Sequence, residues 1–561
     1  MVSTHSQSEL RRALTVHMPA LKQAMGFSWL TSLLVLVPVI FMFEVYGRVV
    51  DAQSMRTLGW LLVLVALAYV VMEVLDWARL EVMREASVVF DAQVAPRVFD
   101  VTMASTQPAT DLKTLREFFY APALMAALES PMALVFLLIM FALHPLLGAV
   151  TLISALVQVG IGVGHHQRTH ADLMGLSKTQ MVSQAVASSS LQNAQLVQGM
   201  GMYEAMHTRW RKVHDQFLQH QRAAMEHGGA FQSANKTFQL VLSSGLLGLG
   251  AWILMDGNLL GGPGMLIVAS TIGARAIAPL GAIVAQWRQV VAAREAYQRL
   301  DKWLTQYPPK SKGMALPEPV GVLSVEALVA SAPNGNTPIL RGLQFAVKPG
   351  NMLAVIGPSG SGKTTLARLL VGVWPAMSGK VRLDGADVFS WHKTELGPHI
   401  GYVPQMVTMP EGTVAQNISR FETTDTPEEA ALQYKRLQTA AQALDLHEIL
   451  RALPQGYDTP MGADGHTFSG GQLQRMAIAR AIYGQPKLLV LDEANSHLDQ
   501  QGEADLAQLL TQLKQQNTTL VVMTHRKALL ALADQVLVLK DGTQQLYGPK
   551  DDVLAKLGVA L

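Results

Sequence analysis

Apolar runs long enough to cross a membrane recur six times before residue 290, each close to the roughly 20 residues that a spanning helix needs. They cover approximately Ala24–Tyr46, Thr57–Leu75, Pro122–Leu143, Pro145–Val163, Thr237–Met255 and Gly264–Trp287. Buried core helices of a soluble protein are the alternative interpretation, but six nearly charge-free runs in succession disfavour it. We therefore predict six transmembrane helices, with a tight turn at His144-Pro145 between the third and the fourth.

The segments between these runs alternate in length. Those after the second and fourth runs are long, about 45 and 73 residues, and their patterns are compatible with helices that protrude tens of ångströms from the membrane. The long segments also contain many basic residues, among them Arg79, Arg84, Arg97, Lys113, Arg116, Arg168, Arg209, Arg211 and Lys212. The short ones contain only Arg48 and Arg56. The positive-inside rule therefore predicts that the N-terminus and the long segments are cytoplasmic.

Composition agrees with a membrane protein and excludes some chemistries. Only 15% of the 561 residues are charged, against about 25% in a typical soluble protein. The first apolar run is too long for a signal peptide, so we expect an uncleaved first span. With no cysteine, the chain has no disulfide and no thiolate metal site. Its net charge of +2 gives no indication of a nucleic-acid partner, and we expect none.

A proline-rich stretch with few apolar residues divides the chain into two parts. We expect a transmembrane domain at residues 1–304, a linker at 305–319 and a nucleotide-binding domain at 320–561. The expected fold is a membrane domain of six transmembrane helices followed by an α/β P-loop domain.

The C-terminal part contains a glycine-rich motif that is typical of phosphate binding. It fits the phosphate-loop pattern G-x-x-x-x-G-K-[ST] and comprises Gly357, Pro358, Ser359, Gly360, Ser361, Gly362, Lys363, Thr364 and Thr365. An apolar strand-like run precedes it and a helix-like run follows, as the motif requires. We expect the loop amides to surround phosphate, Lys363 to reach the β- and γ-phosphates, and Thr364 to ligate Mg²⁺. An ordinary turn is disfavoured by Lys363 and Thr364 directly after Gly362.

A second motif, which is acidic, supplies the groups that hydrolysis needs. Leu488–Leu491 has the pattern of a fully buried parallel strand, and Asp492 and Glu493 stand at its end. We expect Asp492 to hold Mg²⁺ and Glu493 to be the general base for the attacking water. Phe468-Ser469-Gly470-Gly471-Gln472 lies between the two motifs. Three motifs in this order predict a chain that binds and hydrolyses a nucleoside triphosphate.

The three motifs together resemble an ABC-type ATPase domain, which implies ATP and Mg²⁺ as cofactors and further site residues. Gln405, in Tyr402-Val403-Pro404-Gln405, resembles the Q-loop glutamine that senses Mg²⁺ and couples to the membrane domain. Ser469, Gly470, Gly471 and Gln472 resemble the signature that contacts ATP held by the other protomer, with Phe468 in place of the usual leucine. Ser496–Asp499 resembles the D-loop, and His525 resembles the switch histidine at the γ-phosphate.

Two stretches bear on nucleotide selectivity and on transport direction. Ala330-Ser331-Ala332-Pro333 stands where many ABC ATPases have an aromatic residue that stacks on adenine, so the adenine contact is undetermined. Met461-Gly462-Ala463-Asp464-Gly465 resembles the X-loop of exporters, with Asp464 where glutamate is commoner. Six spans fused to one ATPase domain also resemble an exporter half-transporter.

Shorter pieces in both domains resemble type I secretion ATPases, most of all the protease- and lipase-secreting (PrtD-like) subgroup. They are Trp287-Arg288-Gln289, Ala292–Leu300, Arg275–Pro279, Gly199–Met202 with Arg209-Trp210, His144–Gly148, Gly412–Ile418 and Asp492–Ser496. The resemblance implies a homodimer in a bacterial inner membrane that exports an unfolded protein with a C-terminal signal. It also implies a periplasmic adaptor and an outer-membrane channel as partners. A lipid or drug exporter of the same fold is the alternative.

One charged residue lies deep within a predicted span. Arg275 stands about eleven residues into the sixth span, where an arginine is costly and usually faces a partner or a wet cavity. Glu129 in the third span could lie at a similar depth. Three interpretations remain open: a buried pair with Glu129, a residue that lines a cavity, or an arginine that extends to an interface.

Overall fold

The computed structural model describes residues 8–102, 107–257, 262, 264–308, 316–333, 335, 337–462 and 468–558. They fall into two compact units, Met1–Pro309 and Lys310–Leu561. Among the described residues the first unit is entirely helical, whereas the second combines helices with three β-sheets.

Twelve α-helices and one π-helical turn make up the described part of the first unit. The α-helices are α1 (Glu9–Val16), α2 (Met18–Leu34), α3 (Leu36–Glu44), α4 (Val50–Ala52), α5 (Met55–Thr102), α6 (Gln107–Phe118), α7 (Pro122–Leu143), α8 (Pro145–Gln192), α9 (Ala194–Gly199), α10 (Tyr203–Met255), α11 (Gly264–Ala285) and α12 (Trp287–Gln306). The π-helical turn, Val45–Val49, joins α3 to α4.

Six helical segments in the described chain are long and apolar enough to cross a membrane, which confirms the predicted spans. They are Met18–Ala52, Met55–Thr102, Gln107–Leu143, Pro145–Thr169, Tyr203–Met255 and Gly264–Ala285. Helices α5, α8 and α10 contain 48, 48 and 53 residues. At 1.5 Å per residue they are about 70–80 Å long, more than twice the hydrocarbon thickness of a bilayer. The long segments therefore extend the spans as continuous helices, as expected.

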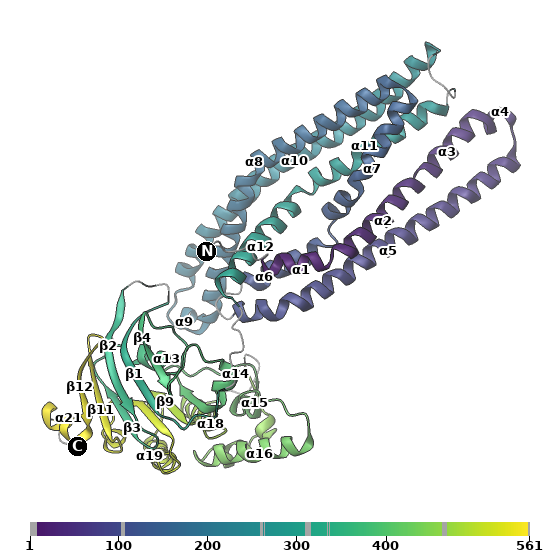
Figure 1. The fold of residues 1–561 in the computed structure, drawn as a ribbon. Helices are drawn as coiled ribbons and strands as arrows, with labels where there is room; N and C mark the ends of the chain where they lie inside the picture. Colours follow the sequence, from purple (N-terminus) through teal and green to yellow (C-terminus); the bar gives the residue numbers. More distant parts are fainter. Residues whose placement is uncertain are drawn as a thin grey trace, which may run out of the picture. The chain divides into compact units, whose positions relative to one another are not determined.

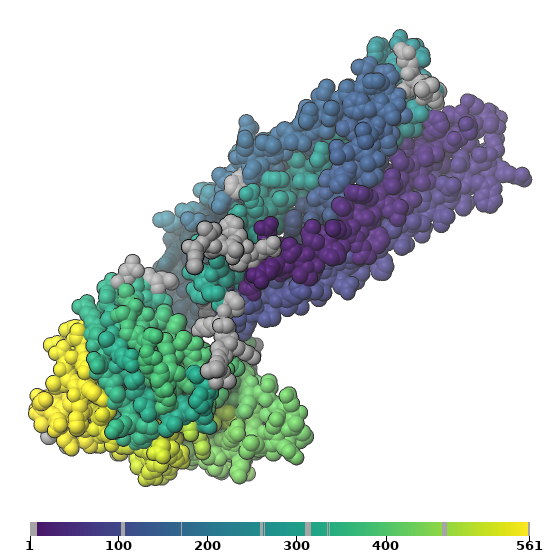
Figure 2. All heavy atoms as spheres, viewed as in Figure 1, coloured from purple at the N-terminus to yellow at the C-terminus, as the bar shows by residue number. Residues whose placement is uncertain are grey.

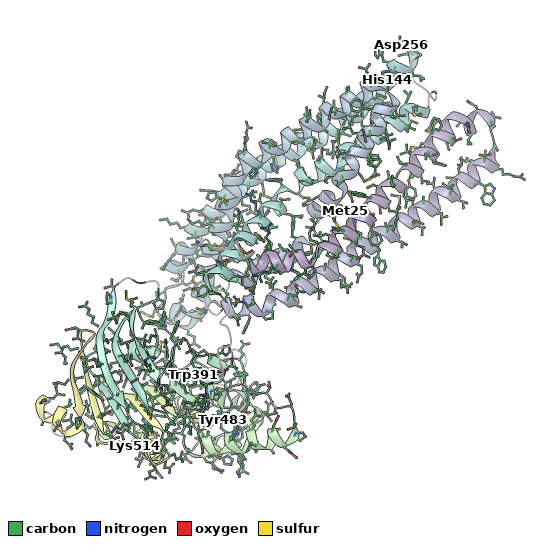
Figure 3. The ribbon with its side chains drawn as sticks, in the orientation of Figure 1. Met25, His144, Asp256, Trp391, Tyr483 and Lys514 are labelled. Atoms are coloured by element: carbon green, nitrogen blue, oxygen red, sulfur yellow. The ribbon has the colours of Figure 1, made fainter. Side chains whose placement is uncertain are left out.

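The spans pack as pairs within the first unit. Helix α8 packs along α10, α7 along α11, and α2 along α5. Helices α7 and α11 lie between the α8–α10 pair and the group formed by α2, α3 and α5 (Figure 1). His144, where α7 turns into α8, and Asp256, where α10 ends, are labelled at the same end of the bundle (Figure 3). The short connections after the third and fifth spans therefore lie at one end.

The buried arginine of this bundle is Arg79, not Arg275. Arg79 is 8% exposed, and its guanidinium donates to Ser28 Oγ of α2 at 3.1 Å. It also pairs with Asp76 on its own helix at 3.3 Å and with Glu129 of α7. The interpretation that Arg275 pairs with Glu129 is therefore wrong, because α2 packs against both α5 and α7 and Glu129 of α7 pairs with Arg79 of α5 instead. Arg275 lies exposed on α11.

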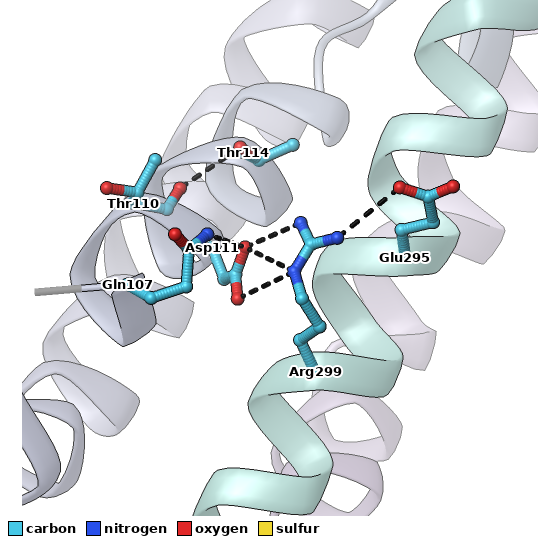
Figure 4. A network of polar contacts seen from close by, with 6 residues as sticks. All are labelled: Gln107, Thr110, Asp111, Thr114, Glu295 and Arg299. Carbon is cyan, nitrogen blue, oxygen red and sulfur yellow. Dashed lines mark hydrogen bonds and ion pairs between the residues drawn. The ribbon is translucent and has the colours of Figure 1, made fainter. Parts of the chain in front are cut away.

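A second polar network holds α12 against α6 (Figure 4). The Asp111 side chain is 1% exposed and accepts bonds from Arg299 Nη2 at 2.8 Å and from Arg299 Nε at 3.2 Å. Glu295, one turn earlier on α12, lies 3.3 Å from Arg299 Nη1. Burial alone would lower the pKa of Arg299, but the bonds to Asp111 and the charge of Glu295 outweigh burial and raise it. Arg299 therefore stays charged and fastens the last helix before the linker region.

The second unit alternates strands with helices. Its strands are β1 (Leu323–Ser331), β2 (Pro338–Val347), β3 (Met352–Ile356), β4 (Ser378–Leu383), β5 (Ala386–Asp387), β6 (Ile400–Val403), β7 (Gly412–Thr413), β8 (Pro460–Met461), β9 (Leu488–Asp492), β10 (Thr519–Met523), β11 (Gln535–Lys540) and β12 (Thr543–Pro549). Its α-helices are α13 (Lys363–Leu370), α14 (Lys393–Leu396), α15 (Val414–Ile418), α16 (Pro427–Gln442), α17 (His447–Arg451), α18 (Gly470–Ile482), α19 (Gln500–Gln515), α20 (Lys527–Ala531) and α21 (Lys550–Leu557).

A six-stranded sheet in the order β12-β11-β3-β10-β9-β6 forms the centre of this unit. All neighbours pair in parallel except β11 and β12. Alternate residues of β3 enter different cores: Met352 and Ala354 pack on one face of the sheet, Leu353 and Val355 on the other. The separate four-stranded sheet β2-β1-β4-β5 is antiparallel. Parallel strands end at a common edge, so the loops after β3, β6, β9 and β10 emerge side by side.

Candidate nucleotide-binding site

The phosphate-loop motif follows β3 and leads into α13, as its pattern requires. Gly362 precedes the helix with φ of 100°, a conformation that only glycine adopts without strain. A Cβ atom at this position would also lie 2.5 Å from Leu340. The loop therefore needs glycine here both for its backbone angle and for its contact with β2.

Lys363, the first residue of α13, is folded inside this loop. It is 6% exposed, and its Nζ donates to the carbonyl of Gly357 at 2.7 Å and to that of Pro358 at 3.1 Å. Its ammonium group is thus held where the loop amides and the N-terminus of α13 favour an anion. The positions of Lys363 and of the helix suit a bound phosphate.

Asp492 ends β9 with its carboxylate buried and unsatisfied. The residue is 1% exposed, and neither carboxylate oxygen has a hydrogen-bond partner among the described residues. Burial raises the pKa of Asp492, and the charge of Glu493 adds to this, while nearby Thr364 and Lys363 lower it. Two buried acceptors without donors, next to a hydroxyl, are a donor set that suits a hard cation such as Mg²⁺.

Three predicted site residues from three different loops meet beside Asp492. Gln405, after β6, donates through Nε2 to Glu493 Oε2 at 3.0 Å. His525, after β10, places Nε2 3.8 Å from Glu493 Oε1. Glu493 itself has φ of 53°, which strains a residue with a side chain by about 1 kcal/mol or more. Strain at this residue, held between an amide and an imidazole, is consistent with a carboxylate that is positioned for chemistry.

The signature segment stands at the start of another helix. Ser469 is the N-cap of α18, and its Oγ accepts from the Gln472 amide at 3.2 Å while Gln472 Oε1 accepts from the Ser469 amide at 3.0 Å. This capping box explains the serine and the glutamine structurally. Gly470 and Gly471 pack against His497 of the D-loop segment. In the part of the chain that the structure describes, no hydrogen bond joins Ser469–Gln472 to the phosphate loop.

The adenine contact stays undetermined, and the resemblance to an exporter X-loop stays a prediction. The stretch Ala330–Pro333 lies at the end of β1 and, as its sequence states, has no aromatic side chain to stack on adenine. Of the X-loop-like stretch, Ala463, Asp464 and Gly465 lie outside the described residues.

The structure adds supporting residues that sequence reasoning missed. Gln474 of α18 is 1% exposed and donates to the Ala494 carbonyl at 2.7 Å, which fixes the turn directly after Glu493. Arg420, after α15, donates to the carbonyls of Gly397, Ile400, Arg480 and Ala481 at 2.7–3.1 Å. Burial, with the nearby charge of Arg480, lowers the pKa of Arg420 to about 10. A glutamine two residues after the signature and a lone arginine give no distinctive sequence signal.

Comparisons with known proteins agree with this geometry. A family model described as ABC transporter matches residues 340–496. The type I secretion system ATP-binding protein PrsD of Rhizobium meliloti (strain 1021) is 33% identical over 540 residues, covering 94% of this chain and 91% of its own. An ATP-dependent lipid A-core flippase of Saccharophagus degradans is 33% identical over 380 residues, covering 67% of this chain and 62% of its own.

A solved structure shows the same fold. A bacterial Atm1-family ABC exporter with ATP bound superposes with a TM-score of 0.79 at 22% identity, covering 96% of this chain and 97% of the other. The expected fold of six membrane spans followed by an ABC ATPase domain is therefore confirmed. The ABC transporter family model and the likeness to PrsD also confirm an ATPase coupled to transport. Because the match to a type I secretion protein extends over nearly the whole length of both chains, this chain belongs to the type I secretion ATP-binding proteins of the ABC transporters.

Proposed function

We propose that this protein uses ATP hydrolysis to export an unfolded protein with a C-terminal secretion signal across a bacterial inner membrane. The chain acts as a homodimer with its ATPase units in the cytoplasm, and it belongs to the PrtD-like subgroup. A periplasmic adaptor and an outer-membrane channel complete the route. The nearly full-length likeness to a type I secretion protein supports the assignment.

The observation that carries the ATPase part is the meeting of Gln405, Glu493 and His525 next to the buried Asp492. Lys363 and the amides from Gly357 to Thr365 hold the phosphates. Mg²⁺, held by Thr364, Asp492 and Gln405, would neutralise charge on the β- and γ-phosphates. Ser469, Gly470, Gly471 and Gln472 of one protomer contact the ATP bound by the other.

Glu493 acts as general base. It accepts a proton from water while the water oxygen bonds to the γ-phosphorus, and the bond from that phosphorus to the bridging oxygen breaks to give ADP and phosphate. Gln405 orients the carboxylate through its 3.0 Å hydrogen bond. His525 faces the other carboxylate oxygen and contacts the γ-phosphate.

Replacing the base tests this assignment. Glu493→Gln keeps the shape and can still bond to Gln405, so ATP binding should persist while turnover falls by about 10² or more. The assay measures both the release of phosphate and the retention of labelled nucleotide in the purified dimer. Wild-type turnover in Glu493→Gln would refute the assignment of the base.

A lipid exporter is the second candidate, favoured by the likeness to a lipid A-core flippase over 67% of this chain. The two functions differ in what changes the ATPase rate. A peptide with a C-terminal secretion signal should change the rate if the cargo is a protein, because cargo and nucleotide act on one conformational equilibrium. Strong stimulation by lipid A without any response to such peptides would favour the flippase.

A further inference from the structure

Arg275 lies near the middle of a membrane span and is exposed on its helix. It stands eleven residues after Gly264 and ten before Ala285, the two ends of α11. At 1.5 Å per residue, either end is about 15 Å away, beyond the reach of an extended arginine side chain. A guanidinium facing lipid at this depth is unfavourable by at least about 3 kcal/mol. The exposed side of α11 is therefore a poor match for lipid at this residue.

The chain offers Arg275 no carboxylate at this depth. Within the six apolar runs identified in the sequence, the acidic residues are Glu44, Glu73 and Glu129. Glu129 is paired with Arg79, and Glu44 lies at the outer end of its span, where it faces Arg48 at 3.5 Å. Glu73 lies near the inner end of the second span. A second copy of this chain would present the same three residues, so an identical partner supplies no free carboxylate at mid-depth either.

The Arg275 side chain makes no hydrogen bond or ion pair with the described residues. The backbone of this residue adds a second polar group at the same level, because Pro279, four residues later in α11, has no N–H to bond the carbonyl of Arg275. The guanidinium has no partner in the described part of the chain, and the carbonyl has no N–H four residues later in the helix. Both groups therefore need water or a polar ligand.

The exposed side of α11 also lacks the large apolar side chains that the other spans display. Leu134 and Leu138 of α7, and Leu240 and Trp252 of α10, are more than half exposed, whereas no large apolar residue of α11 is exposed. The side that bears Arg275 instead presents small or hydroxyl-bearing side chains: Thr271, Ala278, Ala282 and Ala285. In the space-filling view, teal atoms of the later spans are visible between the purple N-terminal helices and the blue helices (Figure 2).

We propose that Arg275 is a cargo-contacting residue on the wall of a water-filled path, where it binds acidic side chains of the polypeptide in transit. The inference rests on the proposed function as an exporter of unfolded protein. A guanidinium binds a carboxylate with two parallel hydrogen bonds, more strongly than it binds a neutral amide. In a homodimer the two copies of Arg275 give the path two positive charges at one level. Segments rich in Asp and Glu are then favoured over segments rich in Lys.

Water access to position 275 can be measured directly because the chain has no cysteine. A single Arg275→Cys variant, in membrane vesicles, is treated with a negatively charged, membrane-impermeant methanethiosulfonate reagent. Leu134→Cys, an exposed apolar position near the middle of α7, serves as the matched lipid-facing control. Ala276→Cys, the buried neighbour, is the second control. Labelling at 275 should be about tenfold or more faster than at 134, since only a hydrated thiol ionises and reacts.

The selectivity is measured with synthetic peptides of equal length that contain Glu, Gln or Lys at alternate positions. Binding to the purified full-length dimer, followed by fluorescence anisotropy, should be about tenfold tighter for the Glu peptide than for the Gln peptide. Arg275→Lys should keep part of this preference, Arg275→Gln should abolish it, and Arg275→Glu should reverse it toward the Lys peptide. Thermal melting of each variant shows that the fold persists.

Two results would overturn the inference. Equal, slow labelling at 275 and 134 would show that Arg275 faces lipid. An unchanged peptide preference in Arg275→Glu would show that the arginine does not discriminate between acidic and basic peptides. Either result leaves ATP hydrolysis by the wild-type protein untouched. Failure of the proposed function would instead appear as a wild-type protein that hydrolyses ATP without any response to peptides that carry secretion signals.

Discussion

Glu129→Gln should destabilise the membrane unit, because this carboxylate is part of the buried charge cluster of Arg79. The guanidinium is shared by Glu129 of α7, Asp76 of α5 and Ser28 of α2, so it ties three helices together. The substitution keeps the size and a hydrogen-bonding amide but removes one of the two negative charges.

The magnitude follows from burial. Breaking a buried ion pair by removing one partner costs about 3–5 kcal/mol. The Arg79 side chain is 10% exposed, but Glu129 is 35% exposed, and Asp76 still faces the guanidinium after the change. We therefore expect a loss of about 1–3 kcal/mol in the free energy of unfolding. Arg79→Lys should be milder than Arg79→Met, since lysine keeps the charge but not the planar set of donors.

The assay is unfolding of the purified protein in mild detergent, with Arg79→Met, Glu129→Gln and the double variant arranged as a double-mutant cycle. Glu81→Gln is the control on the same helix, because Glu81 and Arg84 form an exposed pair and its loss should change nothing measurable. A coupling energy below about 0.3 kcal/mol, or an effect of Glu129→Gln no larger than that of the control, would refute the buried cluster.

Three other predictions concern the remaining contacts. Asp111→Asn should lower stability by about 2 kcal/mol because Arg299 loses its buried charge partner, and thermal melting of the full chain no different from wild type would contradict this. Gln472→Ala opens the capping box of α18 and should cost about 1 kcal/mol; an unchanged denaturant midpoint would argue against that role. Cysteines introduced at Ser359 and Gln472 should crosslink only between chains and only when ATP is present. Heterodimers of a Lys363→Ala chain with a Ser469→Arg chain should keep one intact ATP site. Crosslinks within one chain would overturn the shared site.

The phosphate loop and the spans were predictable from sequence because each depends on consecutive residues. Gly357–Thr365 carries its own pattern, and hydropathy over about 20 residues identifies a span wherever it packs. The buried strand that ends in Asp492 was predicted correctly for the same reason, since all of β9 is buried. The contact of Gln405 with Glu493 needed the sheet order, which puts β6 next to β9.

Pairings across the helical bundle could not be predicted. Hydropathy indicates that a helix crosses the membrane but not which of its sides faces which neighbour. A pair of Glu129 with Arg275 therefore remained possible from the sequence, whereas in the structure Glu129 pairs with Arg79 of α5. Arg420 was missed for a related reason: its partners are four backbone carbonyls, and carbonyls leave no trace in sequence. Long-range polar contacts of this kind depend on packing that only the folded chain defines.

The central claim, that this protein moves polypeptide with the energy of ATP, is tested most directly by transport into inside-out membrane vesicles. The substrate is a protease-sensitive reporter fused to the C-terminal segment of a secreted protein, and the same reporter without that segment is the control. We expect wild-type vesicles to protect the fused reporter from added protease only when ATP is present, and Glu493→Gln vesicles not to protect it. Equal protection of both reporters, or protection in Glu493→Gln vesicles, would contradict the claim.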